Sequence, residues 1–465
     1  MPKNPFQSIL PLIFVGAIIF ETSCSPAKTV SRLRNTSSDI FVALFDSKPE
    51  AEPTVQVSAP NAVTADICMT GPDGQCDTTA SKFPLQEISK VGDRFIYSPK
   101  SGPNLASLKD YLIIDRSGLE LFRFRLALKN QGGSLDAGLG QFALQTIKDE
   151  LTFITQDKFE GRLSATREND EIADYLIAEL KKLNIKPVFG DNYRQQFKMP
   201  NGPTAGKTTN NIIGLIEGSD PVLKDEYVVI GAHMDHTGTL DRGYTCNGGS
   251  GDVICNGADD NGSGTIAVLN VAKALAASRG MLKRSVLIMW FSGEEQGLVG
   301  SKYYVANPAI PLKNHVFMVN LDMVGYSKSF GDAIAAIGTV TSKWADKTAR
   351  ELSKKYPSHK LRFTEKVEGG SDHAPFMNNG IPGIFYHTGV SNNPNYHRTT
   401  DHVDKVDFDG MLVAGKLAYE TVMAAGMTYE LSSQTGMSLV AVKKFVSDSD
   451  ASKGCHSLMD HKYID

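Results

Sequence analysis

Hydrophobic residues in the second half of the chain follow two kinds of pattern. Short, uninterrupted apolar runs are typical of strands buried on both faces of a sheet, and they predict strands at residues 227–232, 285–291, 316–321 and 381–386. Apolar residues three and four positions apart predict amphipathic helices, here at residues 166–183 and 263–279. Because strands and helices alternate, the sequence predicts a single α/β domain over residues 141–429. Its central sheet should be twisted, mixed but largely parallel, and covered by helices on both faces.

The rest of the chain is more weakly patterned. Residues 24–81 are rich in Ser, Thr, Ala, Asp and Pro and predict a low-complexity tether. Residues 82–140 hold short apolar stretches that fit either a small β-rich subdomain or part of a propeptide, and the sequence assigns this extension no role. Residues 430–465 are polar and predict a C-terminal tail.

The N-terminus carries the features of an export signal. Lys3 precedes an apolar run, residues 9–20, which is too short to span a bilayer comfortably but suits the core of a signal peptide. Cys24 ends a segment that resembles a bacterial lipoprotein signal, in which the cysteine is lipidated, although Glu21 departs from that pattern. We therefore expect residues 1–23 to be a signal peptide. The exported chain would be secreted, or anchored in the cell envelope through a lipidated Cys24.

Composition and cysteine usage narrow the expected partners and compartment. The chain is 41% hydrophobic and 22% charged, with a formal net charge of -4. It lacks the basic excess of nucleic-acid-binding proteins, so we expect no nucleic-acid partner. Export implies an oxidising compartment in which cysteines can pair. The natural short-loop pairs are Cys68 with Cys76 and Cys246 with Cys255, although spacing alone does not determine connectivity.

Histidines and acidic residues follow the predicted strands. Ligands of an open α/β sheet bind outside the carboxyl ends of its strands, which makes these side chains candidate site residues. They are His233, Asp259, Asp260, Glu294, Glu295, Asp322 and His397. Each alone is more often a cap or a satisfied polar group, but a set at successive strand ends favours one metal site.

The residue types suggest which metal and how many ions. Histidines with carboxylates suit zinc, although manganese or cobalt could also be held. Two divalent ions about 3.5–4 Å apart need a carboxylate between them. Asp259 is the expected bridge, because the glycines around it leave room for close approach. Asp260 is expected to support it, and Asp235 to orient His233.

Six motifs carry a resemblance to a known family. They are GAHMDH, NGADDNGSG, FSGEEQGLVGS, NLDMVGY, GGSDHAPF and YHRTTDHVDKVD. In this order, over residues 141–429, they resemble the secreted co-catalytic zinc exopeptidases, which include bacterial leucyl-type and vacuolar-type aminopeptidases. More distant relatives are glutamate carboxypeptidases, glutaminyl cyclases and the transferrin receptor ectodomain.

The resemblance implies roles for individual residues. One Zn²⁺ would be held by His233, Asp259 and Asp322, and a second by Asp259, Glu295 and His397. Glu294 would be the general base, and Asp235 would orient His233. His373 would lie near the site, either stabilising an oxyanion or packing behind the ligands. The flanking histidines are expected to be structural or at the surface; they are His236, His387 and His402.

One segment departs from the family pattern, and several activities remain open. Residues 237–255 form an insertion that would be a rigid wall or lid near the site if Cys246 and Cys255 are bonded. The leading expectation is an aminopeptidase that acts on peptide or protein N-termini. A carboxypeptidase would need a basic pocket, for which Arg362 and Arg398 are the candidates. Glutaminyl cyclases usually keep one zinc ion, and non-catalytic ectodomains lose metal ligands, so both are disfavoured.

Overall fold

The computed structural model divides the chain into two compact units, Met1–Leu126 and Ala127–Asp465. In the first unit the structure describes the eight strands given below. In the second it describes residues 134–220, 223–248, 251–364, 367, 369–391, 393–428, 431 and 463–464. The predictions for the signal peptide, for Cys24 and for a Cys68–Cys76 disulfide lie outside the described residues and side chains.

The first unit contains an eight-stranded sheet in the order β1-β2-β3-β6-β5-β4-β7-β8. All of its pairings are antiparallel. Its strands are β1 (Ser31–Arg34), β2 (Phe41–Phe45), β3 (Thr54–Ala59), β4 (Ala65–Met69), β5 (Phe83–Val91), β6 (Arg94–Pro99), β7 (Asp110–Asp115) and β8 (Glu120–Arg125). Strands β1 to β4 fall within the predicted tether, where short strands among Ser, Thr and Pro give little periodic signal.

The second unit is built on a ten-stranded mixed sheet in the order β10-β11-β13-β12-β14-β17-β15-β16-β18, with β9 paired to β11. Its strands are β9 (Lys186–Pro187), β10 (Arg194–Lys198), β11 (Thr208–Ile216), β12 (Tyr227–His233), β13 (Ser285–Phe291), β14 (His315–Leu321), β15 (Ala333–Ile337), β16 (Lys360–Thr364), β17 (Gly383–His387) and β18 (Tyr463–Ile464). The central strands β13, β12, β14 and β17 are parallel. Antiparallel pairings lie towards the edges.

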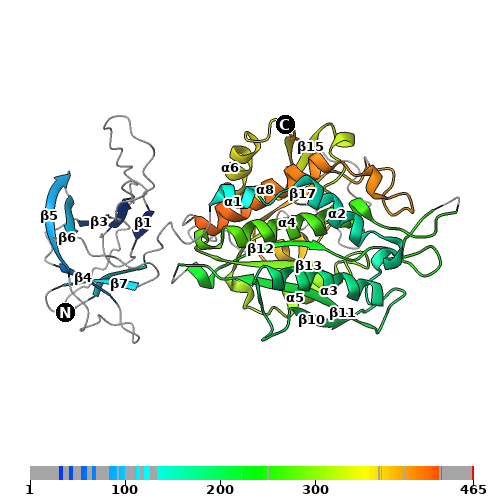
Figure 1. Cartoon of the computed structure of the whole chain (residues 1–465), viewed down its shortest axis with the longest axis horizontal. Coiled ribbons are helices and arrows are strands. Elements are labelled where there is room, and N and C mark those ends of the chain that lie inside the picture. The colour runs from blue at the N-terminus through cyan, green and yellow to red at the C-terminus, as the bar shows by residue number, and fades with distance from the viewer. Residues whose placement is uncertain are drawn as a thin grey trace, which may run out of the picture. The chain divides into compact units, whose positions relative to one another are not determined.

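Helices cover both faces of this sheet. They are α1 (Leu135–Leu139), α2 (Leu144–Ile154), α3 (Arg167–Lys182), α4 (Gly264–Ala277), α5 (Val299–Ala306), α6 (Lys343–Ser353), α7 (His373–Asn378) and α8 (Phe408–Met427). Figure 1 shows α4 and α8 on one side of β12 and β13, and α5 on the other. Along β12, Val228 and Ile230 pack in the core beneath α4 and α8, whereas Val229 packs with Tyr304 of α5 and Phe376 of α7. Burial of both faces explains why the strand is apolar at every position.

The predicted fold class is confirmed, and the long apolar segments coincide with observed elements. The predicted strand at residues 285–291 is β13 itself, and the predicted helix at 263–279 contains α4. The domain boundary differs, because the second unit begins at Ala127 rather than at residue 141. Helix α1 belongs to that unit, since the Ser278 hydroxyl at the end of α4 donates to the backbone carbonyl of Ser134, the N-cap of α1. The predicted tail also contributes β18, which pairs with β16 at the edge of the sheet.

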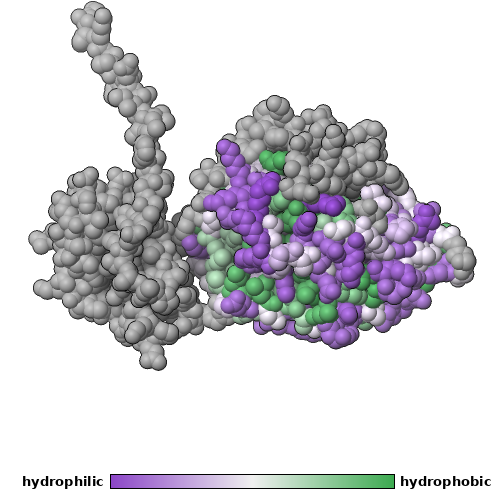
Figure 2. All heavy atoms as spheres, turned by 90° about the horizontal axis from the view of Figure 1, so that it is seen from above, coloured by the Kyte–Doolittle hydropathy of each residue, from purple (hydrophilic) through white to green (hydrophobic). Residues whose placement is uncertain are grey.

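One surface segment of the second unit stands out by its exposed hydrophobic side chains. On the face drawn in Figure 2, hydrophobic residues of the second unit are scattered among hydrophilic ones. The large hydrophobic side chains that stand exposed in the described part of the chain are Leu240, Tyr244 and Val253, and all three lie in the insertion 237–255. No helix among the described residues is long and apolar enough to cross a membrane.

Candidate metal centre

The candidate residues gather at the carboxyl ends of the parallel strands. His233 is the last residue of β12, and Asp322 directly follows β14. Glu294 and Glu295 follow β13, and Asp260 lies in the turn Ala258–Ser263 that leads into α4. Parallel strands end at the same edge of a sheet, so residues far apart in sequence meet there, as the topology of the fold predicts.

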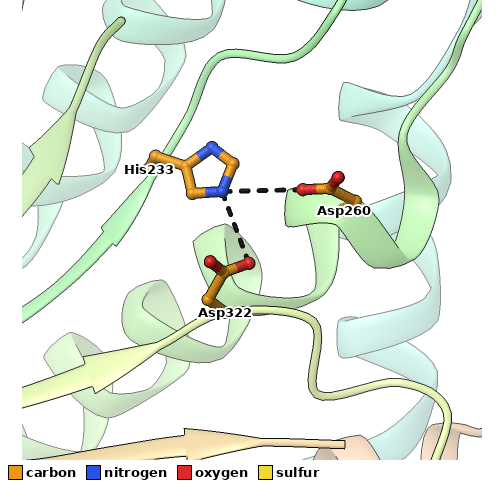
Figure 3. A group of neighbouring side chains, drawn as sticks. All are labelled: His233, Asp260 and Asp322. Atoms are coloured by element: carbon orange, nitrogen blue, oxygen red, sulfur yellow. Dashed lines mark ion pairs between the residues drawn. The ribbon is translucent and has the colours of Figure 1, made fainter. Parts of the chain in front are cut away.

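The first ligand group consists of His233, Asp260 and Asp322. Figure 3 shows the two carboxylates converging on one ring nitrogen of the histidine. His233 Nε2 lies 3.6 Å from Asp260 Oδ1 and 3.4 Å from Asp322 Oδ1. All three residues are buried. One histidine nitrogen and two carboxylate oxygens therefore face a common point, as metal ligands do.

The second ligand group shares Asp260 with the first and adds Glu295, His236 and His397. His397 Nε2 lies 2.8 Å from Glu295 Oε2 and 3.1 Å from Asp260 Oδ2. His236 Nδ1 lies 2.8 Å from the other Glu295 oxygen, Oε1. His236, expected to be structural or at the surface, is fully buried and contacts the candidate ligand Glu295.

Asp259 does not face either ligand group, which corrects the expected bridge. Its Oδ1 accepts the backbone N–H of Gly325 at 2.7 Å, and its Oδ2 accepts the Asn393 amide at 2.8 Å. Asp260 has extended backbone angles, φ -100° and ψ 103°. In extended backbone, neighbouring side chains point to opposite sides, so only one of the two aspartates can enter the site. The structure gives that place to Asp260.

Asp401 holds this turn in position. Its carboxylate accepts the backbone N–H of Asp259 at 3.1 Å and that of Asp260 at 3.0 Å. Burial raises the pKa of Asp401 to about 6, against the opposing effect of these N–H donors. The Asp401 carboxylate thus fixes the backbone that directs Asp260 into the site. In the sequence, the only indication of this role is that Asp401 lies within the motif around His397.

Asp235 lies beside His233, as expected, but its strongest contacts go elsewhere. Its Oδ2 accepts the Ser164 hydroxyl at 2.6 Å, and its Oδ1 accepts the Glu294 backbone N–H at 3.3 Å. His233 Nδ1 lies 3.2 Å from the Asp235 backbone carbonyl and 3.7 Å from its carboxylate. The residue therefore orients the histidine mainly through its main chain and ties the segment after β13 to the segment after β12.

Arg162 is a buried cation that the sequence reasoning did not single out. Its Nε donates to the Met234 carbonyl at 3.1 Å, and its Nη2 to the Gly257 carbonyl at 2.9 Å. A further bond joins Nη1 to the carbonyl of Asn256. Burial lowers the pKa of Arg162, whereas nearby carboxylates, first among them Asp260, raise it. The guanidinium fixes the two loops that carry His233 and Asp260 relative to each other.

The donor set fits divalent metal ions. Asp260 Oδ2 and Asp322 Oδ1 are buried and make no hydrogen bond among the described residues. Leaving a buried carboxylate oxygen without a donor is costly, and several carboxylates this close cannot all stay ionised without cations between them. Asp260 belongs to both ligand groups, so it is placed where a bridging ligand would be. Nitrogen and oxygen donors of this kind are those zinc accepts.

Two further carboxylates lie beside the ligand groups. Glu294 Oε2 is 3.9 Å from His233 Nε2. Burial raises the pKa of Glu294 well above its ordinary value, and its neighbours Glu295, Asp322 and Asp372 add to the rise against the opposing charge of His233. Burial also raises the pKa of Asp372, to about 7. Asp372 was missed in the sequence, where it directly precedes His373.

The other histidines singled out in the sequence contact residues around the ligand groups or at the surface. His373 begins α7, is fully buried, and stacks on the Phe385 ring at 4.4 Å. His387 Nδ1 lies 2.7 Å from the carbonyl of Asp322. His402 Nε2 lies 2.9 Å from Asp252. The expected disulfide between Cys246 and Cys255 is confirmed.

Comparison with known proteins confirms the resemblance seen in the motifs. Residues 211–422 match the family model described as Peptidase family M28. A probable leucine aminopeptidase of Arthroderma otae is 28% identical over 287 residues, which cover 56% of this chain and 73% of that protein. Aminopeptidase Y of Saccharomyces cerevisiae is 30% identical over 234 residues, which cover 48% of this chain and 40% of that protein.

A solved structure shares the fold. The crystal structure of LapB from Legionella pneumophila matches with a TM-score of 0.50 and 20% sequence identity, covering 74% of this chain and 95% of that one. At this level of identity the likeness concerns the fold, and it agrees with the mixed sheet described above.

Proposed function

We propose that this chain belongs to peptidase family M28 and is a zinc-dependent aminopeptidase that hydrolyses the N-terminal peptide bond of peptides. The observation that carries the proposal is the placement of Asp260, which belongs to both ligand groups, with Glu294 beside them. The relatives named above as aminopeptidases support the choice of reaction.

Two zinc ions per chain are the best account of the donor set. His233, Asp260 and Asp322 would hold one ion. Asp260, Glu295 and His397 would hold the other, because His397 Nε2 faces both carboxylates. His236 instead directs its Nδ1 at Glu295 Oε1, which orients that carboxylate. When bound, the ions would supply a water of lowered pKa and polarise the scissile carbonyl.

Glu294 is the residue placed to handle the proton. Its carboxylate is buried at the edge of the first ligand group, and a base must lie within hydrogen-bond reach of the proton that it takes. We assign it the transfer of a proton from the attacking water to the leaving amine. Asp235 holds the backbone N–H of Glu294 and so fixes the segment that carries the base.

Neither candidate arginine gives the carboxypeptidase alternative a specific site. Arg362 stacks on the Phe330 ring at 4.5 Å, and Arg398 is exposed. A pocket for a substrate carboxylate would need a cation aimed at the ligand groups. Arg162 is a buried cation, but its donors are already directed at three backbone carbonyls and are not available to a substrate carboxylate.

The test is an assay of the purified full chain on paired substrates. We expect release of the chromophore from aminoacyl anilides, no release from the N-acetylated forms, loss of activity with a chelator, and recovery with added zinc. Release of residues only from the carboxyl end would favour the carboxypeptidase. Cyclisation of N-terminal glutamine without anilide hydrolysis would favour the glutaminyl cyclase. Bound zinc without turnover of any of these would contradict the aminopeptidase proposal.

We also propose that the protein works outside the cytoplasm. The Cys246–Cys255 disulfide supports this, because disulfides persist in oxidising compartments. Mass spectrometry of the protein from its native host should show removal of residues 1–23. A diacylglycerol-modified Cys24 would establish the lipid anchor, an unmodified N-terminus a secreted form, and an intact Met1 would contradict export.

A further inference from the structure

We propose that the insertion 237–255 is a positioning element for the second ligand group, and that its residue Thr245 fixes the ring of His397. The inference rests on the proposed function, because it concerns how a ligand histidine is held. The insertion is the segment that departs from the family pattern, so it is where this chain has room for a feature of its own.

The Thr245 hydroxyl contacts both the insertion and the ligand. Its Oγ1 donates to the backbone carbonyl of Tyr244 at 2.6 Å, and lies 3.0 Å from His397 Nδ1. A hydroxyl has a single hydrogen, so once that hydrogen is given to the carbonyl, the oxygen can only accept from Nδ1–H. The ring then carries its proton on Nδ1.

This tautomer is the one that a ligand needs. With the proton on Nδ1, His397 Nε2 carries a lone pair, and this nitrogen faces Glu295 Oε2 at 2.8 Å and Asp260 Oδ2 at 3.1 Å. Nε2 makes no hydrogen bond among the described residues. A lone pair beside two carboxylates is repelled unless a cation lies between them, so the hydroxyl and the metal reinforce the same ring orientation.

The backbone holds Thr245 in place from two sides. Asn247 donates its N–H to the His397 carbonyl at 2.8 Å and accepts the Thr399 N–H at 2.9 Å. The Asn247 side-chain amide also donates to the Thr245 carbonyl at 2.7 Å. Thr245 itself has φ +64°, which is strained for a β-branched residue. Such strain persists only where surrounding contacts impose it.

The disulfide connects this exposed stretch to the protein interior. Cys255 is fully buried, and its N–H donates to the Gly238 carbonyl at 3.0 Å. Its partner Cys246 directly follows Thr245. The cross-link therefore ties the residue that contacts His397 to a fixed point of the core, and its removal should loosen the contact.

The experiment measures zinc binding by the metal-stripped full chain against a competing fluorescent chelator. Thr245→Val removes the hydroxyl at nearly constant shape. We expect one of the two zinc Kd values, that of the ion held by the second ligand group, to rise about 10- to 100-fold, the usual effect of losing a partner of a ligand histidine. The other Kd should be unchanged. Thr245→Ser, which keeps the hydroxyl, should restore binding.

Thr239→Val is the matched control, because this threonine lies in the same insertion and its hydroxyl donates to Asp241. It should bind both ions like the unsubstituted chain. A variant with Cys246→Ser and Cys255→Ser should weaken the same zinc as Thr245→Val, and its circular dichroism spectrum should show that the domain is folded. Unchanged Kd values for Thr245→Val would overturn the inference while leaving the proposed function intact. Failure of the unsubstituted chain to bind zinc would instead refute the proposed function.

Discussion

Glu294→Gln is expected to lower kcat about 10²- to 10⁴-fold, the contribution of a positioned general base, while both zinc ions stay bound. The amide has nearly the shape of the carboxylate but cannot take a proton at neutral pH. Glu294 lies close enough to His233 and Glu295 to form a possible ligand group with them. Each proposed ion keeps three other ligands, however, so metal binding should survive the loss of the Glu294 charge. The measurement pairs kcat on an aminoacyl anilide with zinc content per chain.

The neighbouring glutamate provides the control for this experiment. Glu295→Gln changes the same functional group one residue away, but Glu295 faces His236 and His397. This variant should lose zinc together with activity, so the two substitutions separate proton transfer from metal binding. If Glu294→Gln kept full activity, the base would have to be another carboxylate. Asp372 is the next candidate, because it is fully buried and its pKa is raised to about 7.

The fold of the second unit was predictable where burial is most complete. Strand β13 is buried at all of its positions, and its sequence is correspondingly apolar throughout. The same reasoning gave no strands over residues 24–81, where β1 to β4 are four to six residues long and lie among turn-forming residues. Strands that short are specified by pairing with their neighbours in the sheet, which the pattern within one strand does not record.

The candidate site was predictable as a set of strand-end residues but not in its detail. Asp259 and Asp260 are the same residue type side by side, so composition and spacing cannot rank them. The choice depends on the extended backbone at Asp260 and on N–H donors captured by Asp401, far along the chain. The burial of His236 against Glu295 follows from the meeting of two strand ends, which the local sequence does not record.

The structure therefore makes opposite predictions for the two adjacent aspartates. Asp260→Asn should bind at most one zinc ion under conditions that saturate the unsubstituted chain, because the shared ligand of both groups loses its charge. Its kcat/KM should fall about 10³-fold or more, since metal activation contributes several kcal/mol to the transition state. Zinc content and anilide hydrolysis measure both effects.

Asp259→Asn is the matched control, with the same chemical change one residue earlier. Its carboxylate accepts hydrogen bonds from Gly325 and Asn393, and an amide nitrogen in that place would face at least one donor. The free energy of unfolding should fall by about 1–3 kcal/mol for the lost bond, yet the folded variant should keep both zinc ions. Loss of zinc in Asp259→Asn with full retention in Asp260→Asn would reverse the assignment. Because the two variants share composition, charge and neighbourhood, such a difference could arise only from which carboxylate enters the site.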